Sequence, residues 1–269
     1  MDTPRPDLAA MNAIYRVDGA QVETSPNAAG PWDATMQHGS APTALCAWAA
    51  EAIPTAVPMQ VARLTIDLLR PVPVAPLEIE TAVVREGKKI QLIAISLKAK
   101  GVEVARASVL KVRRAEVELP DTVHDTPPNA VLPHLVPAPD PFGDTTANRF
   151  VSGLQMRAGR GAFRTPGPAA IWFKAMRPII EGEAITPLMR AVITADFCNG
   201  SASMLPWEDY TFINGDLTVS LARYPVGDWV LLDAETWLGD HGGGVAFAGL
   251  ADERGYFGRA VQSLVIEKR

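Results

Sequence analysis

The chain has 269 residues, of which 48% are hydrophobic and 20% are charged. These proportions are typical of a globular protein that is long enough for two moderate cores or one large shared core. The net charge of -5 gives no basic surplus for nucleic acid or anionic lipid. The start of the chain has no secretory signal pattern, and no stretch is long enough to span a bilayer. We therefore expect a soluble, cytoplasmic protein that binds neither nucleic acid nor membrane.

The first half of the chain predicts one apolar helix followed by an antiparallel meander. Between Ala41 and Ile53, apolar residues recur at three- and four-residue spacing, and Gly39 and Ser40 precede them as start signals. Four runs rich in β-branched residues come next, separated by Pro-rich or Gly-Lys-Lys turns. The expected strands cover residues 61–69, 77–85, 90–98 and 104–112.

A proline-rich segment separates the two halves. Seven prolines fall between Pro120 and Pro141, and proline both removes a backbone donor and resists helix formation. We interpret residues 116–146 as a linker. Its length of about 30 residues exceeds that of an ordinary loop, so we expect it to cross a surface and join the two halves.

The second half repeats the same order of elements. A strand is expected over residues 169–176, and Thr186-Pro187 is a good N-cap and first-turn pair for a helix that runs through Asp196 toward Leu205. An apolar helix followed by four long strands must be wrapped by that sheet to bury its surface. The remaining expected strands cover residues 212–222, 229–237, 245–252 and 258–266.

Two segments indicate that the halves are copies of one fold. Residues 64–72 read LTIDLLRPV and residues 217–226 read LTVSLARYPV, and they are separated by more than half of the chain. The copies differ at a few positions where the second is polar and the first is apolar, which indicates that only the second carries chemistry. The second copy has Asp196, Asn214 and Gln262 where the first has Ala44, Val61 and Val109.

The cysteines and histidines give little sign of a redox or metal site. Cys46 and Cys198 fall at matching places in the two copies without a nearby histidine in sequence. We therefore interpret them as small apolar packing residues rather than as a disulfide or a nucleophile. No metal site is expected, and the sequence has no glycine-rich phosphate loop. Three of the histidines lie in linker or turn contexts: His124, His134 and His241.

Six short segments, in order along the chain, carry a family resemblance. In the first copy they are residues 32–42, which contain His38-Gly39-Ser40, and residues 68–71 (LLRP). In the second copy they are residues 187–197 (PLMRAVITADF), 214–223 (NGDLTVSLAR), 229–232 (WVLL) and 258–266 (GRAVQSLVI). With these segments the duplicated helix and meander resemble the double hotdog fold. The second copy resembles the TesB-like acyl-CoA thioesterases and the related thioesterase-like superfamily.

The resemblance implies an α+β fold of two tandem hotdog repeats, each a helix wrapped by an antiparallel sheet, over residues 1–115 and 147–269. In that family an aspartate on the second helix, a hydroxyl residue on the following strand and a glutamine near the C-terminus hold the attacking water. Asp196 and Gln262 match two of these residues. The third position holds Asn214, which can also donate and accept hydrogen bonds, and the nearest hydroxyl on the strand is Thr218. We predict Asn214, with Thr218 as the alternative.

Thioester hydrolysis explains why these residue types occur together. The carbonyl is already electrophilic, so the reaction needs an aimed water, a carboxylate that takes its proton and donors for the oxyanion. Asp196 is the candidate base, and Gln262, on the apolar face of a strand, is a buried amide that a water would satisfy. Before the first helix, Gly39 and His38 are the candidates for oxyanion and substrate binding. The site would then lie between the halves.

Each candidate also has a purely structural interpretation. Asp196 can pair with Arg190 or Arg223, and Gln262 can be a buried amide that is satisfied by backbone. Asn214 begins an Asn-Gly pair, which is a strong turn signal. His38 can be a ligand, a base or a loop residue packed on Trp32.

We predict an acyl-CoA thioesterase without a cofactor, and two other classes stay open. A non-catalytic acyl-CoA-binding protein would keep the fold without activity, which the replacement of a hydroxyl by Asn214 makes plausible. An enoyl-CoA hydratase would use Asp33 and His38, which have the spacing of the catalytic pair in hotdog hydratases but lack the Asn-Pro between them. For the assembly, we expect either a monomer or a homodimer with sheets packed back to back.

Overall fold

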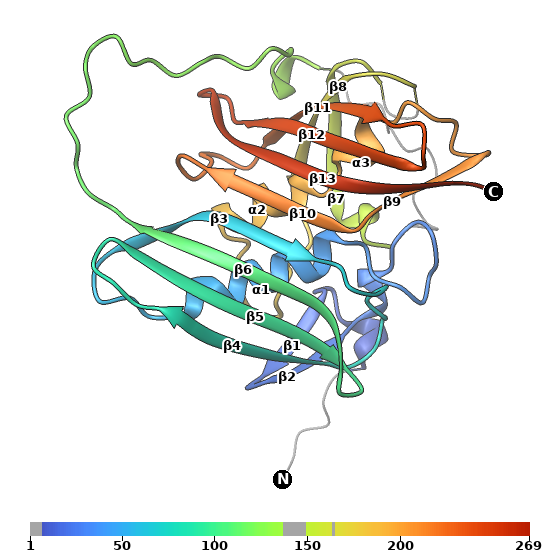
Figure 1. Ribbon diagram of the computed structural model, residues 1–269, viewed down its shortest axis with the longest axis horizontal. Helices are drawn as coiled ribbons and strands as arrows, with labels where there is room; N and C mark the ends of the chain where they lie inside the picture. Colours follow the sequence, from blue (N-terminus) through green and yellow to red (C-terminus); the bar gives the residue numbers. More distant parts are fainter. Residues whose placement is uncertain (1–6, 137–148, 163–164) are drawn as a thin grey trace.

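Thirteen strands form a single antiparallel sheet in the part of the chain that the computed structural model describes, residues 7–136, 149–162 and 165–269 (Figure 1). The first half of the chain supplies β1 (Tyr15–Asp18), β2 (Gln21–Thr24), β3 (Met59–Asp67), β4 (Leu77–Arg85), β5 (Ile90–Ala99) and β6 (Val102–Arg113). The second half supplies β7 (Leu154–Arg160), β8 (Ala169–Ala175), β9 (Tyr210–Asn214), β10 (Asp216–Leu221), β11 (Val230–Leu238), β12 (Gly243–Ala251) and β13 (Tyr256–Lys268). Across the sheet the order is β1-β2-β4-β5-β6-β3-β10-β13-β12-β11-β8-β7, and β9 pairs with β13.

The two halves join at one strand pair in the middle of the sheet, β3 with β10. Thr65 lies opposite Thr218 in this pair, and their hydroxyl oxygens are 3.0 Å apart. The two threonines occupy matching places in the duplicated sequence, because they stand 153 residues apart. When matching residues face each other in an antiparallel pair, an approximate two-fold axis passes between the strands. The halves are therefore related by a pseudo-two-fold rotation.

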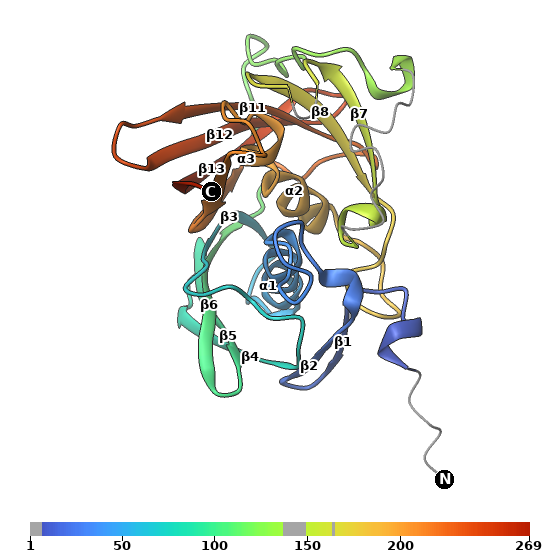
Figure 2. The same ribbon diagram turned by 90° about the vertical axis from the view of Figure 1, so that its right-hand side faces the viewer.

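The described residues form three α-helices on the inner side of the sheet, α1 (Ser40–Ala52), α2 (Pro187–Ala195) and the short α3 (Cys198–Ser201). The start of α1 meets the end of α2, where the hydroxyl of Ser40 donates to the carbonyl of Ile193 over 3.0 Å. The start of α2 meets the end of α1, where the hydroxyl of Thr186 donates to Glu51 over 2.6 Å. The two helices are thus antiparallel. In Figure 2 the strands of the first half curve around α1, and most of its residues are buried.

Most predicted elements lie within two residues of their expected ends, but the second half departs at two places that matter for the site. The helix that we expected to run toward Leu205 ends at Ala195, and Asp196 is its C-cap. The strand expected over residues 212–222 is interrupted at Gly215, which separates β9 from β10. The sequence also did not predict β1, β2 and β7, which are short or rich in polar residues.

Hydrogen bonds to other elements explain both breaks. After Asp196, the backbone N–H of Asn199 donates to Gln262 over 3.1 Å, and the Asn199 side chain donates to the carbonyl of Phe212 over 3.1 Å. Asparagine commonly forms such bonds in place of a helical turn. At the strand break, the carbonyl of Gly215 accepts from Leu68 of the first half over 2.8 Å. Tertiary contacts therefore override the local pattern at both positions.

The predicted linker leaves β6 as an exposed segment over residues 116–124 (Figure 1), and residues 125–136 lie against the second half on the side of the sheet opposite the helices. The indole N–H of Trp172 donates to the carbonyl of Val131 over 2.8 Å, and the backbone N–H of Tyr256 donates to the carbonyl of Thr126 over 2.9 Å. Trp172 belongs to a small apolar cluster that is separate from the main core. Residues 137–146 of the predicted linker lie outside the described residues.

The two cysteines are free and fully buried. Burial raises the pKa of the Cys46 thiol to about 12, and it also raises the pKa of Cys198. Both thiols therefore stay protonated and are poor nucleophiles at neutral pH. Among the described helices, none combines the length and the apolar character needed to cross a bilayer.

Candidate active site

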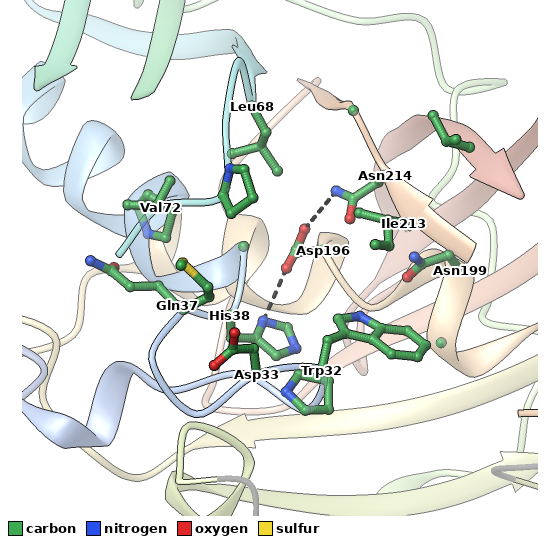
Figure 3. A pocket seen from close by; sticks show the side chains of 18 of the residues that line it. Trp32, Asp33, Gln37, His38, Leu68, Val72, Asp196, Asn199, Ile213 and Asn214 are labelled. Carbon is green, nitrogen blue, oxygen red and sulfur yellow. Dashed lines mark hydrogen bonds and ion pairs between the residues drawn. The ribbon is translucent and has the colours of Figure 1, made fainter. Parts of the chain in front are cut away.

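A cavity of about 660 Å³ lies where the start of α1 meets the end of α2 (Figure 3). Both halves of the chain line it. Its apolar wall includes Trp32, Leu68 and Trp207, and its polar lining includes His38, Asp196 and Asn214. The cavity is thus largely apolar with a few polar groups at one place, which is the usual character of a small-molecule site.

Asp196 is the centre of the polar group, and its side chain is 3% exposed. One carboxylate oxygen, Oδ1, accepts from the side-chain amides of Asn214 over 3.1 Å and Gln262 over 3.2 Å. The other oxygen, Oδ2, lies 3.0 Å from Nδ1 of His38 and 3.2 Å from the hydroxyl of Ser40. These contacts replace the hydration that the buried carboxylate has lost. They also fix its orientation beside the cavity.

Gln262 lies on β13 and is fully buried. Its side-chain nitrogen donates to the main-chain carbonyl of Asp196 over 3.1 Å as well as to the carboxylate, and its oxygen accepts from Asn199 over 3.1 Å. Both amide hydrogens are therefore used by Asp196. In this geometry Gln262 holds both the carboxylate and the main chain of Asp196.

The structure places the two candidates for the third site residue differently. Asn214 ends β9, lines the cavity and donates to Asp196. Thr218 lies farther along, on β10, where its hydroxyl bonds to Thr65 at the seam between the halves. Asn214 is therefore a member of the polar group around Asp196, whereas the Thr218 side chain bonds to Thr65 instead.

Gly39, at the start of α1, allows the carboxylate of Asp196 to lie close to the main chain of the first half. A Cβ atom built on Gly39 would lie 2.8 Å from both carboxylate oxygens of Asp196. Any side chain here would therefore displace the carboxylate. The backbone N–H of Gly39 donates to no described residue, and it sits at the positive end of a helix. It is thus available to a group in the cavity.

His38 precedes Gly39 and is held between two aromatic rings. It stacks on Phe150 at 4.9 Å and on Phe197 at 4.6 Å between ring centroids. Trp32, the expected packing partner, stacks instead on Trp207 at 5.0 Å. The imidazole is therefore fixed beside Asp196, with its Nδ1 toward the carboxylate.

The alternative partners that the sequence allowed are engaged elsewhere. Asp33 accepts from the backbone N–H of Thr35 over 2.8 Å and from its hydroxyl over 2.7 Å, and these bonds lower the pKa of Asp33. Arg223 forms a two-bond pair with the buried Asp252, and Arg190 donates to the carbonyls of Gly227 and Ile185. None of these three residues forms a hydrogen bond or ion pair with His38 or Asp196 in the described part of the chain.

Sequence reasoning missed three residues that support the site. Ser40 appeared as a helix start signal and as part of a resembled segment, without a role in the site, yet its hydroxyl reaches Asp196. Asn199 was placed inside the expected helix, where an asparagine is itself a sign of a break. Phe150 follows the linker and had no local signal for its contact with His38. Within the described residues, no cluster of three or more histidine, cysteine or acidic side chains could hold a metal ion.

Comparison with protein families gives matches in both halves. The model described as the acyl-CoA thioesterase N-terminal domain matches residues 28–112. The model described as the acyl-CoA thioesterase C-terminal domain matches residues 128–266. Together the two matches cover most of the chain and run in the same order as its halves. No curated protein sequence matches the chain significantly.

Solved structures share the whole architecture at low sequence identity. A hot dog fold protein from Alicyclobacillus acidocaldarius is 17% identical, with a TM-score of 0.71 and 97% of each chain covered. The TesB protein of Mycobacterium avium subspecies paratuberculosis is 12% identical, with a TM-score of 0.66 and coverage of 97% of this chain and 98% of that one. The acyl-CoA thioesterase II TesB2 of Mycobacterium marinum is 15% identical, with a TM-score of 0.61 and coverage of 86% and 88%. The chain therefore has a hotdog fold.

Proposed function

Because the chain belongs to the acyl-CoA thioesterase family, we propose that it hydrolyses acyl-CoA thioesters to a free acid and CoA. The observation that carries the proposal is the buried carboxylate of Asp196, which two amide side chains hold beside a cavity lined by both halves. A carboxylate fixed in this way supplies the negative charge that favours removal of a proton from an attacking water. Gln262 and Asn214 keep that charge in place.

The first half supplies the group that polarises the substrate. The thioester carbonyl enters the cavity toward the free backbone N–H of Gly39, where developing oxyanion charge is stabilised at the start of α1. The water adds from the side of Asp196, its oxygen bonds to the carbonyl carbon, and the carbon–sulfur bond then breaks to release CoA. The absence of a side chain on Gly39 lets the two sets of groups meet.

We further propose that each half is one hotdog repeat, in which the helix is wrapped by the strands of its own half, over about residues 1–115 and 147–269. Separate family matches for the two halves support this division, as does the pseudo-two-fold pairing of Thr65 with Thr218. The polar site then occupies one end of the helix pair. At the other end, Thr186 and Glu51 form a different contact.

The test is the replacement Asp196→Asn, which keeps the shape of the side chain and removes its charge. Release of free thiol from a panel of saturated acyl-CoAs should fall by a factor of about 10² to 10⁴, while the unfolding transition stays cooperative. Asp228→Asn is the matched control, since Asp228 is an exposed aspartate paired with Lys174. Undiminished thiol release by the Asp196→Asn variant would contradict the assignment.

A non-catalytic acyl-CoA-binding protein is the second candidate, because Asn214 stands where the resembled family has a hydroxyl. The same panel separates the two. Wild-type protein that binds acyl-CoA in a titration calorimeter but releases no thiol would establish the binding protein and overturn hydrolysis.

A further inference from the structure

His38 has a close partner on one ring nitrogen and none on the other. Its Nδ1 lies 3.0 Å from Oδ2 of Asp196, as the dashed line in Figure 3 marks. No described residue forms a hydrogen bond with Nε2. The side chain is only 10% exposed and lines the cavity. The open nitrogen therefore belongs to a buried ring beside the cavity rather than to a surface histidine.

The ring cannot readily turn to change these roles. Phe150 and Phe197 stack on its two faces, with interplanar angles of 16° and 29°. Any other ring plane would break both contacts, and a half-turn of the ring within the stack would place carbon instead of Nδ1 beside the carboxylate. Nδ1 therefore stays beside Asp196.

The contact between Nδ1 and the carboxylate requires a proton. Two groups that both present lone pairs at 3.0 Å repel each other, so either the ring or the carboxyl carries a hydrogen there. The other neighbour of Nδ1 is the backbone N–H of Ser40 at 3.2 Å, which Nδ1 can accept only when it carries no proton. A hydrogen bond to a charged carboxylate is the stronger of the two. With the proton on Nδ1, Nε2 is left with its lone pair.

The carboxylate is already occupied on its other side. Oδ1 accepts from both Asn214 and Gln262, and Oδ2 faces His38 and Ser40. A carboxylate with so many donors orients its neighbours well but has little room for a reacting water. The imidazole offers a second acceptor, because Nε2 lies on the side of the ring away from the carboxylate, where a water can approach it.

We propose that His38 is a catalytic residue of the thioesterase reaction, with Nε2 as the atom that takes the proton of the attacking water and Asp196 as its positioning residue. The inference rests on the proposed function. As the water oxygen bonds to the carbonyl carbon, its proton passes to Nε2, and the ionised Asp196 stabilises the imidazolium. When the carbon–sulfur bond breaks, its electron pair goes to sulfur, which then receives the proton from Nε2. The ring returns to its starting form.

The first test separates the nitrogens of His38 from its shape. His38→Phe retains a flat ring between Phe150 and Phe197, so the variant should still unfold cooperatively, at a lower midpoint than the wild type because Asp196 loses one donor. Thiol release should nevertheless fall by a factor of about 10² or more. Turnover within threefold of the wild type would overturn the proposal, because a ring without nitrogens would then suffice.

The second test restores the nitrogens from solution. His38→Ala leaves a slot between the same two phenylalanines, and added imidazole should recover part of the lost turnover by saturable binding. Pyrazole has nearly the same shape but is a much weaker base, so it should bind in the slot and recover little. Equal recovery with both compounds would assign His38 a packing role and reject the proposal.

A third measurement does not depend on turnover and therefore distinguishes failure of this inference from failure of the proposed function. The ¹⁵N chemical shifts of His38 should show a proton on Nδ1 and a bare Nε2 in the wild type. In Asp196→Asn the proton should move to Nε2, with Nδ1 accepting from Ser40. A wild-type ring protonated on Nε2 alone would refute the dyad even in an active enzyme. If the shifts were as expected but the protein hydrolysed no acyl-CoA, the proposed function would be rejected, while the pairing of His38 with Asp196 would stand.

Discussion

Gly39 shows how one missing side chain can govern the site. Its backbone has φ of -57° and ψ of -27°, which any residue adopts without strain. Alanine is therefore acceptable to the backbone, but its Cβ would lie 2.8 Å from both oxygens of Asp196. We expect Gly39→Ala to lower kcat/KM for acyl-CoA at least tenfold, because the carboxylate must move away from its donors. The free energy of unfolding, measured by urea titration, should fall by only about 1 kcal/mol.

Gly243→Ala is the control for this prediction. A Cβ on Gly243 would meet nothing within 4 Å, so both activity and stability should stay near the wild-type values. If Gly39→Ala were as active as this control, Asp196 would not need its observed position. Such a result would remove the carboxylate from the mechanism.

Asn214 and Thr218 give a second test at the scale of single residues. Asn214 donates to Asp196 over 3.1 Å, whereas Thr218 bonds to Thr65 at the seam. A hydrogen bond to a charged group typically contributes about 1.5–3 kcal/mol, which is lost when its donor is removed. Asn214→Ala should therefore reduce thiol release roughly tenfold or more, and Thr218→Ala should leave it unchanged. Steady-state kinetics of the two variants with one acyl-CoA make the comparison, and the reverse order would contradict it.

The polar residues of the site could be predicted only in part from the sequence. Comparison of the two copies singled out Asp196, Asn214 and Gln262, because a polar residue among apolar strand and helix positions must find a partner. It could not identify Phe150, whose contact with His38 joins a segment after the linker to a loop before α1. Contacts of that kind depend on tertiary packing, which one sequence does not specify.

At the scale of elements, the sequence predicted the existence of helices and strands better than their interruptions. Periodic apolar runs gave α1 and the central strands, since burial of one face fixes both pattern and element. The end of α2 at Ala195 and the break at Gly215 depend on hydrogen bonds to β13 and to the first half. Both breaks bring polar side chains to the cavity. The departures from regular structure are thus where the candidate site is built.

The described linker segment offers a prediction at the same scale. Gly255 has φ of +152°, and a Cβ there would lie 2.6 Å from the carbonyl of Thr126. That carbonyl also accepts from the backbone N–H of Tyr256 over 2.9 Å. Gly255→Ala should therefore detach residues 125–136 from the start of β13 and speed cleavage of the linker by thermolysin, which cuts before apolar residues such as Val131 and Leu132. Thiol release should persist, because the cavity lies on the opposite side of the sheet.

Gly19→Ala is the matched variant for the linker. Gly19 also has a positive φ, +60°, but a Cβ there would meet nothing within 4 Å. Both substitutions strain the backbone, so both should lower the free energy of unfolding by about 1 kcal/mol or more. Only Gly255→Ala should expose the linker. Equal protease sensitivity of the two variants would show that the linker is not held by this contact.

For the molecule as a whole, a buried thiol and a partly buried tyrosine hydroxyl with raised pKa values predict a loss of stability at high pH. Burial raises the pKa of the Cys46 thiol from 9.0 to about 12 and that of the Tyr224 hydroxyl from 10.0 to about 12. Above pH 9 the unfolded chain loses these protons while the folded protein keeps them, so unfolding becomes more favourable as pH rises. The free energy of unfolding should fall between about pH 9 and 12. Urea titrations from pH 8 to 11 measure it, and Cys46→Ala should flatten the fall.

The main core also crosses the junction between the halves, and this gives a prediction about the whole chain. Buried residues of both halves belong to one apolar cluster, and the site combines Gly39 from the first half with Asp196 from the second. A chain cut after the exposed Leu119 should therefore still assemble when residues 1–119 and 120–269 are expressed together. A tag on one fragment should recover both, with thiol release close to that of the intact protein. Each fragment alone should be inactive, because it lacks half of the site and exposes one side of its helix. Hydrolysis by residues 120–269 alone would show that the second half needs no oxyanion donor from the first.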